Sequence, residues 1–173
     1  SIEDNTGGGF NQIIDTELTT WSLTPRANMD WILIGQDHQS TIGADLYYAF
    51  YNSDRGRNRD EPPIHKYRAH QTTVGLYGQD DFRLSDGLTA QFGGRFMWNK
   101  FTGGDEFDPN APGAFGSKRE TTGAVDQYYV YNIGLEYKMR QNLTTFGRTG
   151  RSIRLPTINE RIASSDDSTF KLK

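Results

Sequence analysis

Residues 70–101 contain two long segments of alternating polarity on either side of a tight turn, Ser85-Asp86-Gly87. An Asp-Gly turn between alternating segments is a strong signal for a β-hairpin. Each arm is about fifteen residues long, whereas strands of globular proteins usually have five or six. In both arms one set of alternate positions is apolar or aromatic and the other set is polar. Long strands with one apolar and one polar face are typical of barrels that cross a membrane.

The composition of the 173 residues is compatible with this interpretation. The mean hydropathy is −0.75 and no run of roughly eighteen apolar residues occurs, so no transmembrane helix is predicted. A β-barrel is not excluded, because half of each strand and all loops of such a protein are polar. The net charge of −3 predicts no nucleic-acid partner. The absence of cysteine excludes disulfides and thiolate metal sites within these residues.

The sequence predicts an all-β fold, an antiparallel up-and-down sheet of transmembrane strands. The connections alternate between short turns and two long loops at residues 53–69 and 102–126, as in outer-membrane barrels. Pro25 falls within the first strand, and the pairing should break there because proline lacks a ladder donor. No helix is predicted. The six predicted strands cover residues 15–29, 40–51, 70–84, 88–101, 127–139 and 143–152.

Two charged residues on the apolar face locate the bilayer. For a rise of roughly 3.3 Å per residue and a tilt near 40°, Asp80 lies about 10 Å from the Ser85–Gly87 turn and Lys100 about 30 Å from it. A charge near either interface costs about 0–1 kcal/mol, against about 2–4 kcal/mol at the midplane. Six strands cannot close a membrane barrel, since the smallest known has about eight. The chain is therefore expected to be a fragment of a larger barrel.

Several stretches, in order along the chain, resemble TonB-dependent outer-membrane receptors. One is the hairpin QTTVGLYGQDDFRLSDGLTAQFGGRF, and another is the strand beginning WSLTPR at Trp21. A third is YNIGLEYKMRQNLTTFGRTGRSIRLPTINERI, which contains a phrase similar to the family's GRSFRxPTxxE. The residues that match this phrase, taken as barrel-wall residues, are Gly150, Arg151, Arg154, Pro156 and Glu160.

The resemblance implies a 22-stranded outer-membrane barrel closed by an N-terminal plug domain. It implies TonB-energised uptake of a scarce ligand of the iron–siderophore, haem or cobalamin class. The implied partners are the plug domain, the remaining strands, the TonB complex, outer-membrane lipid with lipopolysaccharide, and a metal chelate as ligand. No plug or TonB box is recognised within these residues. Neither a catalytic residue nor a cofactor is implied.

The first predicted long loop is rich in basic residues that could bind an anionic chelate or lipopolysaccharide phosphates. A solvated loop, balanced by nearby carboxylates, is the alternative. A separate set of charged residues (Arg26, Arg95, Glu136, Lys138 and Arg148) falls on the polar faces of strands and is expected to form a polar wall. The candidate ligand contacts of the loop are Arg55, Arg57, Arg59, His65, Lys66, Tyr67 and Arg68.

Two interpretations from other protein classes compete with a receptor barrel. Residues 103–107 spell GGDEF, the signature of diguanylate cyclases, but the proline-rich residues 108–113 that follow cannot form the apolar strand that such an enzyme needs. As a loop, the same acidic stretch could be solvated or could bind Ca²⁺. The other alternative is a small soluble β-barrel that binds a ligand inside. It would bury the apolar face within this chain, at Val74, Leu76, Phe92 and Phe96.

Overall fold

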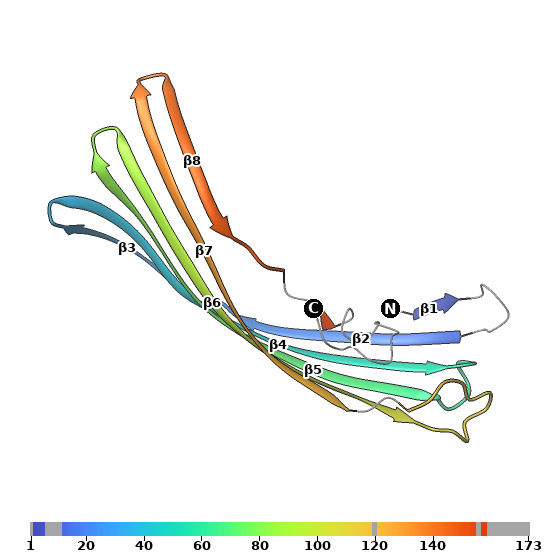
Figure 1. Cartoon of the computed structure of the whole chain (residues 1–173). Helices are drawn as coiled ribbons and strands as arrows, with labels where there is room; N and C mark the ends of the chain where they lie inside the picture. The colour runs from blue at the N-terminus through green and yellow to red at the C-terminus, as the bar shows by residue number, and fades with distance from the viewer. Residues whose placement is uncertain (1, 6–11, 119–120, 155–156, 159–173) are drawn as a thin grey trace.

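The computed structural model of the chain is one strongly curved antiparallel sheet (Figure 1). It describes residues 2–5, 12–118, 121–154 and 157–158. Within these residues, no helix is long and apolar enough to cross a membrane. The strand order is β1-β2-β4-β5-β6-β7-β8, and β3 also pairs with β4. The strands are β1 (Ile2–Asn5), β2 (Gln12–Leu23), β3 (Arg26–Leu33), β4 (Gln36–Gly56), β5 (His65–Ser85), β6 (Leu88–Phe107), β7 (Thr122–Arg140) and β8 (Leu143–Arg151).

β2 and β3 lie end to end along the same side of β4. Between them, Thr24 and Pro25 leave the strand conformation. The Pro25 carbonyl still accepts a hydrogen bond from the Ala44 amide at 3.0 Å, so β4 remains aligned with both pieces. The break predicted from the proline therefore occurs at this position, and the cause is the missing ladder donor.

Tight turns close one end of the sheet, at the upper left of Figure 1. They are the two-residue connections Ile34-Gly35, Asp86-Gly87 and Gln141-Asn142. Ile34 and Gly35 have φ angles of 52° and 75°, the left-handed conformation that a two-residue hairpin turn of this type requires. The connections at the opposite end are longer. We call the two ends the turn end and the loop end.

The loops at the loop end are shorter than the sequence predicts. Residues 57–64 and 108–121 form them, instead of 53–69 and 102–126, because the strands continue into the predicted loops. In these continuations both faces of the sheet carry polar residues, so the alternation that marks the strands elsewhere disappears. The predicted bounds are wrong for this reason. The charged residues that share the otherwise apolar face there are Asp54, Lys66, Arg68 and Glu106.

The register assembles one apolar face across the whole sheet. Residues opposite one another form rows such as Leu46–Val74–Trp98, and this face lies on the outside of the curve; we call it the convex face (Figure 1). It is left uncovered, with Leu76 56% and Phe92 47% exposed. A soluble barrel that buries this face within the chain is contradicted.

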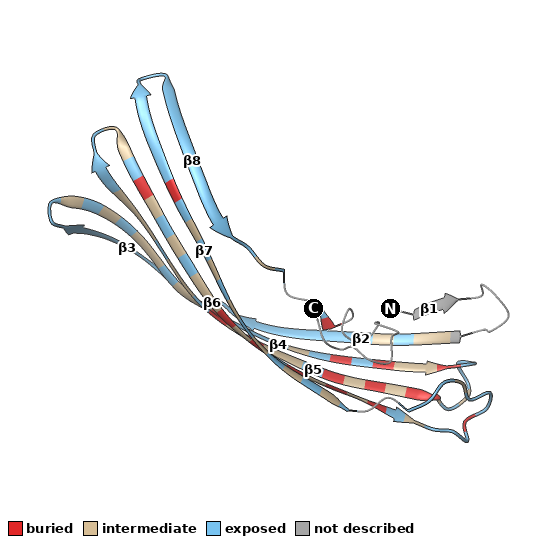
Figure 2. Cartoon of the chain, in the orientation of Figure 1, coloured by how far each residue is buried: buried red, intermediate tan, exposed pale blue. Residues whose placement is uncertain are grey.

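The opposite, concave face holds most of the buried side chains, near the loop end of β4 and β5 (Figure 2). Ile158, beyond β8, packs there against residues of the central strands. Toward the turn end few side chains are buried, and Phe146 of β8 is 80% exposed. The loop end is therefore the firmly packed part of the described chain. Its core consists of Tyr51, Tyr67, Ala69, Phe101 and Ile158.

Candidate functional site

The loop end is held together by His65, the first residue of β5. Its Nδ1 lies 2.8 Å from Oδ2 of Asp105 at the end of β6, and its Nε2 lies 2.9 Å from the carbonyl oxygen of Phe115. Both side chains of the His65–Asp105 pair are buried, at 4% and 0% exposure. His65 therefore fastens the loop 108–121 to two strands of the sheet. Its ring also stacks on Tyr67 and Phe107.

His65 and Tyr67, two of the candidate ligand contacts predicted from the sequence, lie in the packed part of the sheet and not in an exposed loop. The two residues are 3% and 6% exposed. Both ring nitrogens of His65 are engaged by protein atoms, and Tyr67 belongs to the packed core. The prediction placed them in a loop, whereas the strand continuation turns their side chains toward the concave face.

The predicted basic cluster is divided between the two faces, because alternate residues of a strand point to opposite sides. Arg55 lies on the concave face, with its guanidinium carbon 4.6 Å from the centre of the Tyr67 ring. Lys66 and Arg68 lie on the convex face. Arg68 Nη1 donates to Oδ1 of Asp54 at 2.7 Å. These residues do not form one binding surface.

Arg57 and Arg59 do lie in a loop, residues 57–64, and both are exposed. A Cβ added at Gly113 would meet the Arg57 side chain, so this loop touches the loop 108–121. Gly113 has a φ of 68°, a conformation that side chains rarely adopt. The two loops of the loop end thus meet at the side chain of Arg57, two residues before the exposed Arg59.

The concave face carries a polar network midway along the central strands. Arg95 Nη2 of β6 lies 2.6 Å from Oδ2 of Asp45 in β4, so the ion pair spans β5. A Cβ on Gly75 of β5 would lie 3.1 Å from the Arg95 Nη2 atom, so the glycine leaves room for the guanidinium. The Arg95 guanidinium also lies over the Tyr77 ring, 5.7 Å from its centre.

A second part of this wall centres on Asn99, which is fully buried. The side chains of Gln71 and Thr73 donate to its Oδ1 at 2.7 and 2.8 Å. The sequence indicates a polar wall that includes Arg95, but it does not identify Asp45 and Asn99 as the residues that organise it. Their partners depend on the register of β4, β5 and β6, and the alternation alone does not fix that register.

The stretch that resembles the family's GRSFRxPTxxE sequence begins in β8 and continues beyond the end of that strand. A Cβ on Gly150 would overlap the Tyr131 carbonyl oxygen, so glycine permits the close approach of β8 to β7. Arg151 borders a hollow of about 550 Å³ that Arg95 also lines. Arg154 follows as an exposed residue. Two further predicted wall residues lie outside the described residues, Pro156 and Glu160.

The GGDEF string forms the loop end of β6 and is not a loop. Gly103 pairs with Ala69 of β5 and Thr122 of β7, and residues 104–107 pair with β5, so the string is part of the sheet. Asp105 and Glu106 face opposite sides, which prevents them from binding one metal ion together. No group of three or more His, Asp or Glu side chains suited to a metal occurs in the described parts of the chain.

The sequence matches one protein family over residues 2–171, and this family is described as TonB dependent receptor-like, beta-barrel. The chain belongs to this family. No match was found among curated proteins. The TonB-dependent receptor barrels are outer-membrane proteins that act in transport, and the antiparallel up-and-down sheet with its uncovered apolar face agrees with this assignment.

In outer-membrane barrels the apolar face of the sheet contacts lipid and the polar face lines the interior. The apolar convex face and the polar concave face match these two descriptions. Tight turns of such barrels lie on the periplasmic side, which places the loop end outside the cell. In the described sheet β8 pairs with β7 alone, and an open edge in lipid leaves backbone groups unsatisfied. Membership of this family implies further barrel strands, a plug domain and an interaction with TonB.

Proposed function

We propose that this receptor wall serves TonB-energised uptake of a scarce ligand of the iron–siderophore, haem or cobalamin class, and that an anionic chelate is preferred. The observation that carries the preference is the contact of the two outer loops at Arg57, with the exposed Arg59 in the same loop. Guanidinium groups form strong paired hydrogen bonds with carboxylates and phosphates. A chelate with such groups would be captured at the outer rim before it enters the barrel.

The anchor at His65 gives this capture surface its shape. Because the loop 108–121 is fastened to the wall through Phe115, the contact of that loop with Arg57 is held in place. Preorganised loops lose less conformational entropy when a ligand binds. In this proposal His65 positions the loops and does not touch the ligand.

The partly exposed cations of the convex face, Lys66 and Arg68, have a different proposed partner, the phosphates of lipopolysaccharide. Lys66 and Arg68 lie beyond the apolar band, toward the outside of the cell. Asp54 and Glu106 alternate with them, an arrangement that suits phosphate groups bridged by divalent cations. This contact would hold the barrel in the outer leaflet and would not select the transported ligand.

Replacing both arginines by alanine in the complete receptor is expected to weaken ligand binding by about tenfold or more, since each charge-assisted hydrogen bond contributes roughly 1.5–3 kcal/mol. Binding of radiolabelled ferric siderophores, haem and cobalamin to cells with this receptor alone measures the effect. The control is Arg83→Ala, which removes an exposed arginine at the turn end. Equal affinity of the Arg57→Ala/Arg59→Ala receptor and the control, at equal membrane levels, contradicts the proposal.

A further inference from the structure

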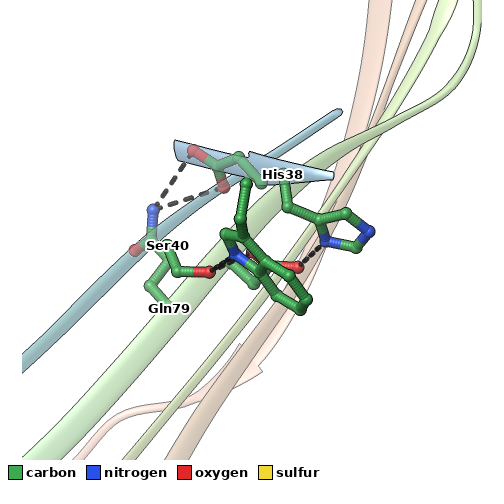
Figure 3. Close-up of polar contacts among 6 residues, drawn as sticks. His38, Ser40 and Gln79 are labelled. Atoms are coloured by element: carbon green, nitrogen blue, oxygen red, sulfur yellow. Dashed lines mark hydrogen bonds and ion pairs between the residues drawn. The ribbon is translucent and has the colours of Figure 1, made fainter. Parts of the chain in front are cut away.

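The convex face carries a hydrogen-bonded polar cluster near the turn end (Figure 3). Trp31 Nε1 donates to the Ser40 hydroxyl oxygen at 2.7 Å, and that hydroxyl donates to Oδ1 of Asp80 at 2.5 Å. His38 Nδ1 lies 2.7 Å from the second carboxylate oxygen, Oδ2. The four residues come from β3, β4 and β5 and occupy neighbouring positions of one face. The cluster therefore fixes the orientation of one carboxylate on the lipid-facing surface.

The carboxylate of Asp80 remains partly open. Its side chain is 28% exposed, against 11% for His38. The His38 ring lies between Trp31 and Phe82, with ring centres 4.5 and 5.2 Å away, so it is held firmly against the sheet. Among the described residues, His38 is the one basic side chain within ion-pair distance of Asp80. The open side of this carboxylate faces the bilayer, next to an indole ring.

A trough in the apolar surface begins beside this carboxylate. Gly78 and Gly94 lie directly opposite each other on β5 and β6, on the convex face. A Cβ added at Gly94 would meet nothing within 4 Å, so the space above the glycine pair is open. The trough has a volume of about 510 Å³, and its borders include Ile42, Phe92 and Ile133. It runs from Asp80 in the direction of the bilayer centre.

We propose that this site binds a phospholipid of the periplasmic leaflet whose headgroup carries a primary ammonium group. The ammonium binds the Asp80 carboxylate beside the Trp31 indole, and one acyl chain lies over Gly78 and Gly94. A carboxylate and an aromatic face together favour a cation. An anionic headgroup would be repelled by the same carboxylate. The inference needs only the membrane location of the barrel and does not depend on the identity of the transported ligand.

The depth of the site fits this occupant. Asp80 lies about 10 Å from the periplasmic turn, where the polar headgroups of that leaflet begin. The glycine pair lies further in, where the acyl chains are. On the convex face between Lys100 and the tight turns, Asp80 is the one carboxylate in the described chain. A headgroup cation therefore has one acidic partner at this level.

The test is native mass spectrometry of the complete receptor in detergent, with phosphatidylethanolamine and phosphatidylglycerol of the same acyl chains added separately. The wild-type receptor is expected to retain phosphatidylethanolamine about tenfold better, the effect of one charge-assisted hydrogen bond. Asp80→Asn is expected to abolish this preference. Gly94→Val, which fills the trough, should lower retention of phosphatidylethanolamine, while Gly147→Val, at another open glycine of the convex face, should not.

Equal retention of the two lipids by the wild-type receptor overturns the proposal, as does an Asp80→Asn receptor that keeps the preference. Equal retention by Gly94→Val and Gly147→Val places the acyl chain elsewhere and also overturns it. Heat-modifiability on gels establishes that each variant is folded. If Asp80→Asn does not fold, the wild-type preference and the two glycine variants decide the outcome, because neither glycine substitution touches the hydrogen-bonded cluster.

Discussion

Replacing His65 by alanine is expected to lower the free energy of unfolding of the receptor barrel by about 3 kcal/mol, because removing the hydrogen-bond partner of a buried carboxylate costs roughly 1–3 kcal/mol or more. The substitution takes the imidazole away from a carboxylate with no exposure and leaves the Phe115 carbonyl without its contact. Equilibrium unfolding by denaturant in lipid vesicles measures the loss. The loop 108–121 should also become the first site of protease cleavage.

His70 provides the matched control. It lies five residues further along β5, is exposed, and occupies the convex face. His70→Ala should change the free energy of unfolding by less than about 0.5 kcal/mol, as for most surface substitutions. Similar losses at the two positions, or an unchanged cleavage pattern in His65→Ala, would show that the loop is not fastened through this pair.

An arginine in place of Leu76 is expected to destabilise the barrel by about 2–4 kcal/mol, because the residue faces lipid close to the bilayer midplane. Leu76 is 56% exposed on the convex face and lies about midway between the two predicted interface charges. The same substitution at Leu84, beside the periplasmic turn, should cost about 0–1 kcal/mol. Folding equilibria in lipid vesicles compare the two variants directly.

The informative quantity is the difference in destabilisation between arginine at position 76 and arginine at position 84. Both leucines lie on β5 and are partly exposed, so the residue type and the chemistry of the substitution are matched. If the convex face contacted water, arginine would be tolerated at both positions with little loss. Equal small effects at Leu76 and Leu84 would therefore rule out a lipid-facing surface at this level of the sheet.

The sequence predicts the hairpins well wherever one face is apolar. The Asp86-Gly87 turn and the long alternating arms beside it correspond to β5 and β6, because a period of two is required when one face meets lipid and the other does not. The interruption at Pro25 is also readable, since it follows from a missing donor. These features depend on the local sequence and can be predicted without knowing which strands pair.

The loop end and the polar cluster could not be predicted in the same way. Where the strands leave the apolar band both faces are polar, so the extent of β4, β5 and β6 is hidden in the sequence. The His65–Asp105 contact joins residues 40 positions apart, and so does the contact of Ser40 with Asp80. Asp80 was readable as an interface charge, but its hydrogen-bond donors depend on the pairing of β4 with β3 and β5. Such contacts depend on the register in which the strands pair, and the alternation of polarity alone does not fix that register.

We expect the convex face to meet lipid and the concave face to line the barrel interior. The 173 residues contain no cysteine, so single cysteines can carry spin labels at Leu76, Gln79, Gln91 and Phe92. In the complete receptor in lipid vesicles, labels at positions 76 and 92 should collide frequently with dissolved oxygen, which concentrates in the bilayer, and rarely with a water-soluble nickel complex. Labels at positions 79 and 91 should show low oxygen collision. Oxygen accessibility that does not alternate between the two faces, or that is higher at 79 and 91, would contradict the account.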